Sequence, residues 1–198
     1  MSVLAVGTDC SGLDAPIQAL KLMNVKIDHK FASNIDPKCR STIDANGAPG
    51  VMYENMTARD NASAPKVDLY VAVFSCQPFS SVGKRLGTED PRGGLFFSCL
   101  AYIKARTPKC FVLENVKGLK TINKGETFKY FLAELEALED YEVHHQILNS
   151  KDFRVPHNRE RIFFVGLRKD AVVKPFAFPA PQPTHLNLNL FIDRHDTK

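Results

Sequence analysis

Two kinds of segment alternate along the first 140 residues of the chain. Short runs of β-branched and apolar residues, typical of strands, are separated by longer segments in which apolar residues recur at every third or fourth position, as in helices. The expected strands are residues 3–6, 27–33, 67–74 and 110–114, with a further short one near 50–55, and the expected helices are 13–23, 37–47, 95–106 and 126–140. This alternation predicts an α/β fold with a mostly parallel sheet.

The pattern changes after residue 140. Residues 141–149 and 161–168 both resemble strands, and no helical segment lies between them. Consecutive strands joined by a loop of this length usually pair antiparallel, so we expect a seven-stranded sheet that ends in an antiparallel hairpin. Residues 171–198 are rich in proline and have no clear period, which predicts an extended tail after an α/β domain at 1–170.

Composition excludes several classes of protein. The chain has 198 residues, of which 44% are hydrophobic and 24% charged, as in a globular domain. No apolar stretch reaches the roughly 18 residues of a membrane span, and the start lacks a signal-peptide pattern, so we expect a cytoplasmic or nuclear protein without membrane contact. The five cysteines are widely spaced and form no CxxC, which argues against disulfides and a metal site. A net charge of +4 permits a polyanionic partner without requiring one.

Candidate chemistry gathers where strands end. The apolar run that begins at residue 71 leads to Cys76, in a loop of polar residues. A single cysteine is most often inert packing, but a loop position near the cations Lys84 and Arg85 favours a thiolate nucleophile.

Further polar residues follow other expected strands. Glu114 closes one strand, and burial there would raise its pKa and favour a proton-donating form, unless the carboxylate serves a salt bridge. Arg159 and Arg161 share a face if their segment is extended, and guanidinium groups suit carbonyl or phosphate oxygens, although a solvated rim is the simpler interpretation. Gly12 follows the first strand, where it could let the backbone approach a ligand or merely serve a tight turn.

Three motifs, taken together, carry a resemblance. "SCQPFSSVGKRLGTEDPRGGLFF", "FVLENVKGL" and "NSKDFRVPHNRERIFFVGLR", in this order and separation, resemble the central motifs of the cytosine-5 DNA methyltransferases. The likeness extends from about residue 3 to residue 185. It implies a Rossmann-like S-adenosylmethionine-dependent methyltransferase fold and methyl transfer to carbon 5 of a cytosine in double-stranded DNA.

The resemblance also implies roles for individual residues. The Cys76 thiolate would attack carbon 6 of a flipped cytosine, Glu114 would hydrogen-bond or protonate nitrogen 3, and Arg161, in one motif with Arg159, would hold the ring carbonyl. S-adenosylmethionine would lie across the first three strand ends. Its expected neighbours are Cys10, Ser11 and Gly12 at the methionine part, Asn34 at the ribose, Ile35 and Asn55 at the adenine, and Leu95 alongside.

Several positions depart from the family pattern. Asn34 and Asn55 stand where the family has acids, which predicts weakened cofactor binding because a neutral amide accepts weaker hydrogen bonds. The family continues with a target-recognition region and two further motifs beyond this length. Three interpretations therefore stay open: the N-terminal subunit of a split enzyme whose second polypeptide supplies recognition, a truncated inactive relative acting as a binding module, and an RNA cytosine-5 methyltransferase.

Overall fold

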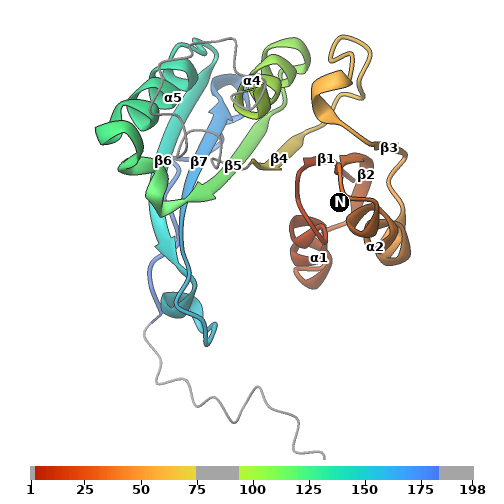
Figure 1. The fold of residues 1–198 in the computed structure, drawn as a ribbon, viewed down its shortest axis with the longest axis horizontal. Coiled ribbons are helices and arrows are strands. Elements are labelled where there is room, and N and C mark those ends of the chain that lie inside the picture. Colours follow the sequence, from red (N-terminus) through yellow and green to blue (C-terminus); the bar gives the residue numbers. More distant parts are fainter. Residues whose placement is uncertain (1–2, 75–93, 183–198) are drawn as a thin grey trace, which may run out of the picture.

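Seven strands form a single mixed sheet. In the computed structural model, which describes residues 3–74 and 94–182, the strands lie in the order β3-β2-β1-β4-β5-β7-β6 (Figure 1). β7 pairs antiparallel with both β5 and β6, and the other paired strands are parallel. Their bounds are β1 (Leu4–Asp9), β2 (Ile27–Ser33), β3 (Val51–Tyr53), β4 (Leu69–Val73), β5 (Cys110–Val116), β6 (Tyr141–Asn149) and β7 (Glu160–Arg168). The predicted mostly parallel sheet with an antiparallel final hairpin is confirmed.

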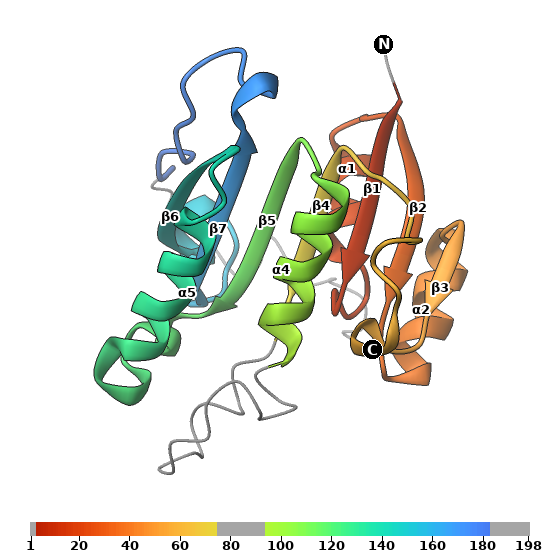
Figure 2. The same ribbon diagram turned by 90° about the horizontal axis from the view of Figure 1, so that it is seen from above.

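Helices cover both faces of the sheet. α4 (Gly94–Arg106) and α5 (Glu126–Glu136) lie on one face, and α1 (Ala15–Leu22) and α2 (Pro37–Gly47) lie on the other (Figures 1 and 2). Short 3₁₀ turns connect the main elements: η1 (Met56–Ala58), η2 (Lys117–Lys120), η3 (Ile122–Gly125), η4 (Ser150–Phe153) and η5 (Lys169–Ala171). This three-layer arrangement is the doubly wound α/β architecture that the sequence pattern predicts.

Local sequence sets where α2 begins, and tertiary contacts set where α5 ends. Asp36 accepts a hydrogen bond from the backbone N–H of Lys38 at 2.8 Å, and Pro37 occupies the first turn of α2. The helix expected at 126–140 instead ends at Glu136. The chain turns there into β6, whose Tyr141 donates its hydroxyl to the carbonyl of Pro108 at 2.6 Å. Anchoring this ring fixes the turn and shortens the helix.

Aromatic side chains fill the layer between the sheet and the helices α4 and α5. Phe96 of α4 and Phe131 of α5 stack with ring centroids 3.9 Å apart, and Phe74, just after β4, lies 5.7 Å from Phe96. These rings are buried and belong to one continuous core cluster. The core therefore fixes α4 and α5 against the sheet close to the carboxyl end of β4.

The strand order places a topological switch between β1 and β4. From β1 the chain proceeds to β2 and β3 on one side, and then crosses to β4 and β5 on the other. In open α/β sheets, ligands bind outside the carboxyl ends of the strands at such a switch point. The predicted cofactor residues follow β1, β2 and β3, and the predicted catalytic Cys76 follows β4 in sequence but lies outside the described residues.

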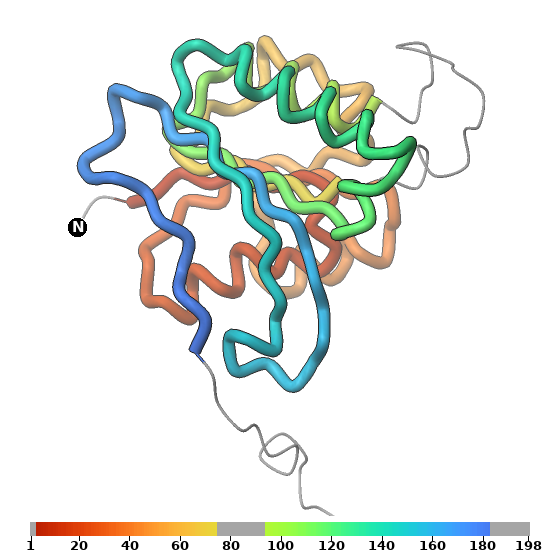
Figure 3. Tube along the Cα trace, turned by 90° about the vertical axis from the view of Figure 1, so that its left-hand side faces the viewer, coloured from red at the N-terminus to blue at the C-terminus, as the bar shows by residue number. Residues whose placement is uncertain are grey.

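The described part of the tail, residues 172–182, contains neither helix nor strand. It runs beside β6 in Figure 3, and Phe176 packs on His144 with ring centroids 5.0 Å apart. The neighbouring His145 packs on Phe128 of α5, so His144 points to the opposite face of the sheet. This part of the tail therefore lies against the sheet face that α5 does not cover, and the expected boundary at residue 170 stays a prediction.

Candidate active site

Glu114 and Arg161 meet on one face of the paired strands β5 and β7. Glu114 lies opposite Phe163, and Arg161 lies opposite Val116, so the two residues are diagonal neighbours on the same face. The Nε atom of Arg161 donates to Oε1 of Glu114 at 2.9 Å, and its Nη1 atom donates to the carbonyl of Glu160 at 2.8 Å. The structure thus brings together the two side chains that the sequence nominates from separate motifs.

Burial and charge act in opposite directions on the Glu114 carboxyl. The side chain is only 13% exposed, and burial raises its pKa above the ordinary value. The positive charges of Arg161 and Arg159, together with the Arg161 hydrogen bond, lower it again without cancelling the effect of burial. Glu114 is therefore held in place as a carboxylate, yet it accepts a proton more readily than a solvated glutamate.

Asn115, which the sequence analysis did not single out, fixes the end of β5 to the end of β4. Its side chain is 1% exposed, and its Nδ2 donates to the carbonyl of Phe74 at 2.9 Å. Phe74 is the last described residue before Cys76 along the chain. An amide at the end of an apolar strand was the signal available in the sequence, because a buried amide there requires hydrogen-bond partners.

Asn149 holds the segment that carries Arg159. Its Oδ1 accepts a hydrogen bond from the Arg159 backbone N–H at 3.1 Å, and its Nδ2 donates to Oδ1 of Asn158 at 2.7 Å. Ser150 adds two bonds, from its N–H to the Arg159 carbonyl and from its hydroxyl to the carbonyl of His157. The side chain of Arg159 itself is exposed, just before β7 begins.

The loop between β1 and α1 has a left-handed backbone at three of its residues. Cys10, Gly12 and Asp14 have φ values of 54°, 63° and 63°. A Cβ atom added at Gly12 would meet no atom within 4 Å, so this glycine serves its left-handed conformation and faces open space. Ser11 donates its hydroxyl to Oδ1 of the buried Asp14 at 2.8 Å, which closes the loop on itself.

The other predicted cofactor residues differ in their surroundings. Asn34 is buried and its Oδ1 accepts from the Asp36 N–H at 3.0 Å, whereas the exposed Asn55 accepts from the backbone and hydroxyl of Thr57. Ile35 is 78% exposed just beyond β2, which leaves an apolar side chain open to a flat ligand. Leu95 packs, partly buried, against the core in the first turn of α4.

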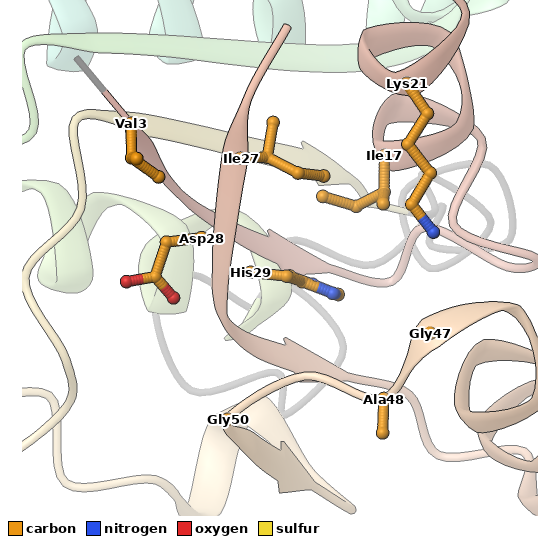
Figure 4. A pocket seen from close by; sticks show the side chains of 9 residues that line it. All are labelled: Val3, Ile17, Lys21, Ile27, Asp28, His29, Gly47, Ala48 and Gly50. Atoms are coloured by element: carbon orange, nitrogen blue, oxygen red, sulfur yellow. The ribbon is translucent and has the colours of Figure 1, made fainter.

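A cavity of about 490 Å³ lies elsewhere, between α1, the start of β2 and the end of α2 (Figure 4). It is lined by Val3, Ile17, Lys21, Ile27, Asp28, His29, Gly47, Ala48 and Gly50. None of the predicted catalytic or cofactor residues belongs to this lining. The cavity lies toward the amino ends of β1 and β2, away from the switch point, so it does not mark the candidate active site.

Within the described residues, no cluster of three or more His, Cys, Asp or Glu side chains is arranged to hold a metal ion. Over the same residues, no helix combines the length and apolar character that crossing a membrane requires.

Comparison with known proteins identifies the family. Residues 10–195 match the family model described as C-5 cytosine-specific DNA methylase. The chain belongs to this family. The match includes the loop at Cys10, the strand that carries Glu114 and the segment that carries Arg159 and Arg161.

Curated relatives resemble this chain over most of its length. The chain is 43% identical over 158 residues to the Type II methyltransferase M1.ScrFI of Lactococcus lactis subsp. cremoris, covering 80% of this chain and 40% of the relative. It is 42% identical over 154 residues to the Type II methyltransferase M.HpaII of Haemophilus parainfluenzae, covering 76% of this chain and 43% of that protein. The chain therefore spans less than half of the length of these relatives.

Solved structures share the fold at lower identity. The structure of the S. pombe Dnmt2 methyltransferase has a TM-score of 0.71 at 22% identity, covering 87% of this chain and 53% of that one. The Entamoeba histolytica methyltransferase EhMeth has a TM-score of 0.74 at 18% identity, covering 99% of this chain and 62% of that one. These similarities confirm the methyltransferase type of α/β fold.

Proposed function

We propose that this chain forms the catalytic and cofactor-binding part of a DNA (cytosine-5)-methyltransferase. The observation that carries the proposal is the 2.9 Å bond between Glu114 of β5 and Arg161 of β7. β5 lies next to β4, the strand that leads in sequence to Cys76. Family membership and relatives named Type II methyltransferases support the same activity. Because these relatives are Type II methyltransferases, we also expect a role in a restriction-modification system.

Each nominated residue has a distinct chemical task on the target base. The Cys76 thiolate forms a bond to carbon 6 of a cytosine that has swung out of the duplex, because the stacked ring offers no face to the sulfur. Glu114 supplies a hydrogen bond or proton at nitrogen 3, which its raised pKa favours. Arg161 orients Glu114 and offers its remaining donors to the ring carbonyl, and Arg159 adds positive charge beside them.

The reaction balances with one methyl donor and one base. Addition of sulfur at carbon 6 makes carbon 5 nucleophilic, and carbon 5 then takes a methyl group. Loss of the carbon 5 proton to a base restores the double bond and expels the cysteine as a thiolate. S-adenosylmethionine would supply this methyl group from its sulfonium, and the thioether S-adenosylhomocysteine would be the leaving group.

The residues at the ends of β1, β2 and β3 fit such a cofactor. Gly12 faces open space, so a ligand can approach its backbone closely. The exposed Ile35 offers an apolar contact suited to an adenine ring. Cys10, Ser11, Asn34, Asn55 and Leu95 would complete the cofactor site. Burial raises the pKa of Cys10 to about 12, so this thiol stays neutral and does not compete with Cys76 as a nucleophile.

A second polypeptide that supplies target recognition belongs to this proposal. The chain covers 40% of M1.ScrFI and 43% of M.HpaII, so more than half of each relative has no counterpart here. An inactive binding module is the second candidate, favoured by the amides Asn34 and Asn55 in place of the expected acids.

The decisive experiment traps the covalent intermediate. A DNA duplex containing 5-fluorocytosine cannot release the cysteine, so incubation with S-adenosylmethionine should give a protein–DNA adduct that survives denaturation. Cys76→Ser should abolish the adduct, whereas Cys39→Ser, which alters a half-buried thiol on α2, should leave it intact. Parallel reactions with 5-fluorocytosine RNA, and with a candidate partner polypeptide, test the RNA and split-enzyme interpretations.

Absence of any adduct, with and without a partner, would contradict the proposed enzyme. Calorimetric binding of S-adenosylhomocysteine in that case would favour the binding module.

A further inference from the structure

A buried ion pair lies directly beneath the predicted cofactor loop. Asp9, the last residue of β1, and Arg59, the residue that follows η1, have side chains without solvent exposure. The guanidinium binds the carboxylate with two parallel hydrogen bonds, from Nη1 to Oδ1 at 2.9 Å and from Nη2 to Oδ2 at 2.8 Å. Such paired bonds fix both the distance and the relative orientation of the two groups.

Neighbouring groups complete the hydrogen bonding of the pair. Tyr70 donates its hydroxyl to Oδ2 of Asp9 at 2.6 Å, and the Nε atom of Arg59 donates to Oδ1 of Asn61 at 3.0 Å. Three aromatic rings also surround the guanidinium, with centroids 4.8 to 5.2 Å from its central carbon: Phe31, Tyr53 and Tyr102. The arginine therefore has a single position, set from several sides.

The pair joins two segments that are distant in sequence and that both carry predicted cofactor residues. Asp9 immediately precedes Cys10, Ser11 and Gly12. Arg59 immediately follows η1, whose first turn is capped by Asn55. A second contact joins the same two segments: the Cys10 sulfur lies 3.4 Å from the sulfur of Met56 in η1.

Two other bonds anchor the same β3–β4 connection farther along the chain. Tyr102 donates its hydroxyl to the carbonyl of Pro65 at 2.6 Å, and Arg106 donates to the carbonyl of Ala62 at 2.8 Å. Both attach the connection to α4, not to β1. The Arg59–Asp9 pair, together with the Cys10–Met56 contact, ties the end that contains Asn55 to β1 and the β1–α1 loop instead.

We propose that Arg59 is a positioning residue for cofactor binding, which sets the distance between the β1–α1 loop and η1 through its bond to Asp9. The inference rests on the proposed function. A buried ion pair is often no more stabilising than apolar residues of similar volume, so stability alone does not account for it. The geometry of the pair explains its presence better, since a cofactor that touches both the β1–α1 loop and η1 requires the two segments at a fixed separation.

Burial also explains why the pair must be removed as a unit. Burial raises the pKa of Asp9 above its ordinary value, although the Arg59 hydrogen bonds act in the opposite direction. Deleting one partner would leave an unpaired charge in the core and risk unfolding. The double variant Asp9→Asn/Arg59→Gln removes both charges while keeping polar groups of similar size.

The test compares affinity for S-adenosylhomocysteine with thermal stability in the 198-residue chain. The double variant should bind about tenfold more weakly by calorimetry, a size typical of residues that act through others. Arg59→Lys keeps the charge but only one point of contact, so its affinity for S-adenosylhomocysteine should lie between those of the double variant and the wild type. Arg106→Gln is the matched control, because it loosens the same connection at its far end: it should lower the melting temperature and leave the affinity unchanged.

Each remaining outcome decides between the inference and the proposed function. Wild-type affinity in a folded double variant and in Arg59→Lys would overturn the inference alone. Equal losses of affinity in the Arg59 and Arg106 variants would also overturn it, since a general structural role predicts that result. Failure of the wild-type chain to bind would overturn the proposed cofactor site and the inference with it. If the double variant does not fold, the affinity of Arg59→Lys tests the inference, because this variant retains a cation beside Asp9.

Discussion

Arg161 and Glu114 form a hydrogen-bonded ion pair, 2.9 Å from Nε to Oε1, between the antiparallel strands β7 and β5 at the candidate active site. The arginine limits how far burial raises the pKa of the glutamate. It also restricts the carboxyl to one orientation. A nucleobase that contacts both side chains would therefore meet the Arg161 guanidinium and the Glu114 carboxyl in a relative position that the sheet determines.

Replacing Glu114 with glutamine should remove most of the methyl transfer without unfolding the protein. The amide keeps the shape and can still accept the Arg161 hydrogen bond, but it cannot deliver a proton to nitrogen 3. General acid catalysis contributes about 100- to 10,000-fold, so we expect the rate of methyl transfer to fall at least about 100-fold. Transfer of a radiolabelled methyl group to DNA at saturating S-adenosylmethionine measures this rate. The assay uses the chain alone or with its partner polypeptide, whichever is active.

Glu160→Gln provides the control for this variant. Glu160 pairs with Lys117 at 2.8 Å at the rim of the same strand pair, where both side chains are about half exposed. Exposed ion pairs contribute at most about 1 kcal/mol, so both rate and stability should change little. Similar losses in Glu114→Gln and Glu160→Gln would contradict a specific role for Glu114.

Restoring acids at Asn34 and Asn55 should strengthen cofactor binding. In each case the side-chain oxygen already accepts a local backbone hydrogen bond, from Asp36 or Thr57, and aspartate can make the same bond. The added charge should strengthen bonds to ribose hydroxyls and the adenine amino group by about 1 kcal/mol at each site, or roughly fivefold in affinity. Calorimetry with S-adenosylhomocysteine measures the difference for Asn34→Asp, Asn55→Asp and the double variant.

Asn46→Asp adds the same charge away from the candidate site, near the end of α2. Its affinity should match that of the wild type. Equal effects at Asn46 and Asn34 would indicate a general electrostatic cause, and unchanged affinity in the double variant would refute the assigned cofactor contacts.

Periodicity was sufficient to predict most of the sheet, because most of the strands contain short β-branched or apolar runs that pack against the helices. Strand β3 was the least distinct, since it pairs through only three residues, Val51 to Tyr53. The end of α5 was wrong by four residues because the contact between Tyr141 and Pro108 joins segments 33 residues apart. Periodicity in a local window contains no information about such a contact.

Some residues of the candidate site were predicted from local sequence, and others depend on long-range contacts. Glu114 and Arg161 were predicted, because each carries a charge where an apolar strand was expected to end or to begin. The structure extends β5 two residues beyond Glu114, to Val116. The Asp9–Arg59 pair was not, since the two residues are 50 positions apart and each resembles an ordinary loop or strand-end charge. Asn115 and Asn149 were missed for a related reason: their importance lies in backbone groups that they hold, which only the folded chain brings within reach.

Gly166 in β7 should tolerate no side chain. A Cβ atom there would lie 2.0 Å from Cε1 and 2.1 Å from Cζ of Phe111, a fully buried residue of β5. Gly166→Ala must displace this ring, and overpacking of this kind costs about 1 to 3 kcal/mol. Gly118→Ala, where the nearest atom is at 3.8 Å, should change the free energy of unfolding by less than about 0.5 kcal/mol. Urea denaturation of both variants measures the difference, and equal stability would show that the strand can shift to relieve the contact.

His29 should make the protein less stable in mild acid. Its side chain is 7% exposed, and burial lowers its pKa, assisted weakly by Lys21 and opposed by Asp14, whose Oδ2 lies 3.4 Å from Nε2. The folded protein thus prefers the neutral ring, while the unfolded chain binds a proton near the ordinary value of about 6.5. Below that pH the unfolded state gains protons first, so the free energy of unfolding decreases as the pH falls.

His29→Gln removes this contribution, so the variant should lose less stability than the wild type between pH 7 and pH 5. Urea denaturation at intervals across that range measures the two slopes. His157→Gln, which removes a histidine from an exposed loop, is the control and should retain the wild-type slope. Parallel slopes for His29→Gln and the wild type would mean that the ring is protonated equally in the folded and unfolded states, and that its contact with Asp14 compensates for burial.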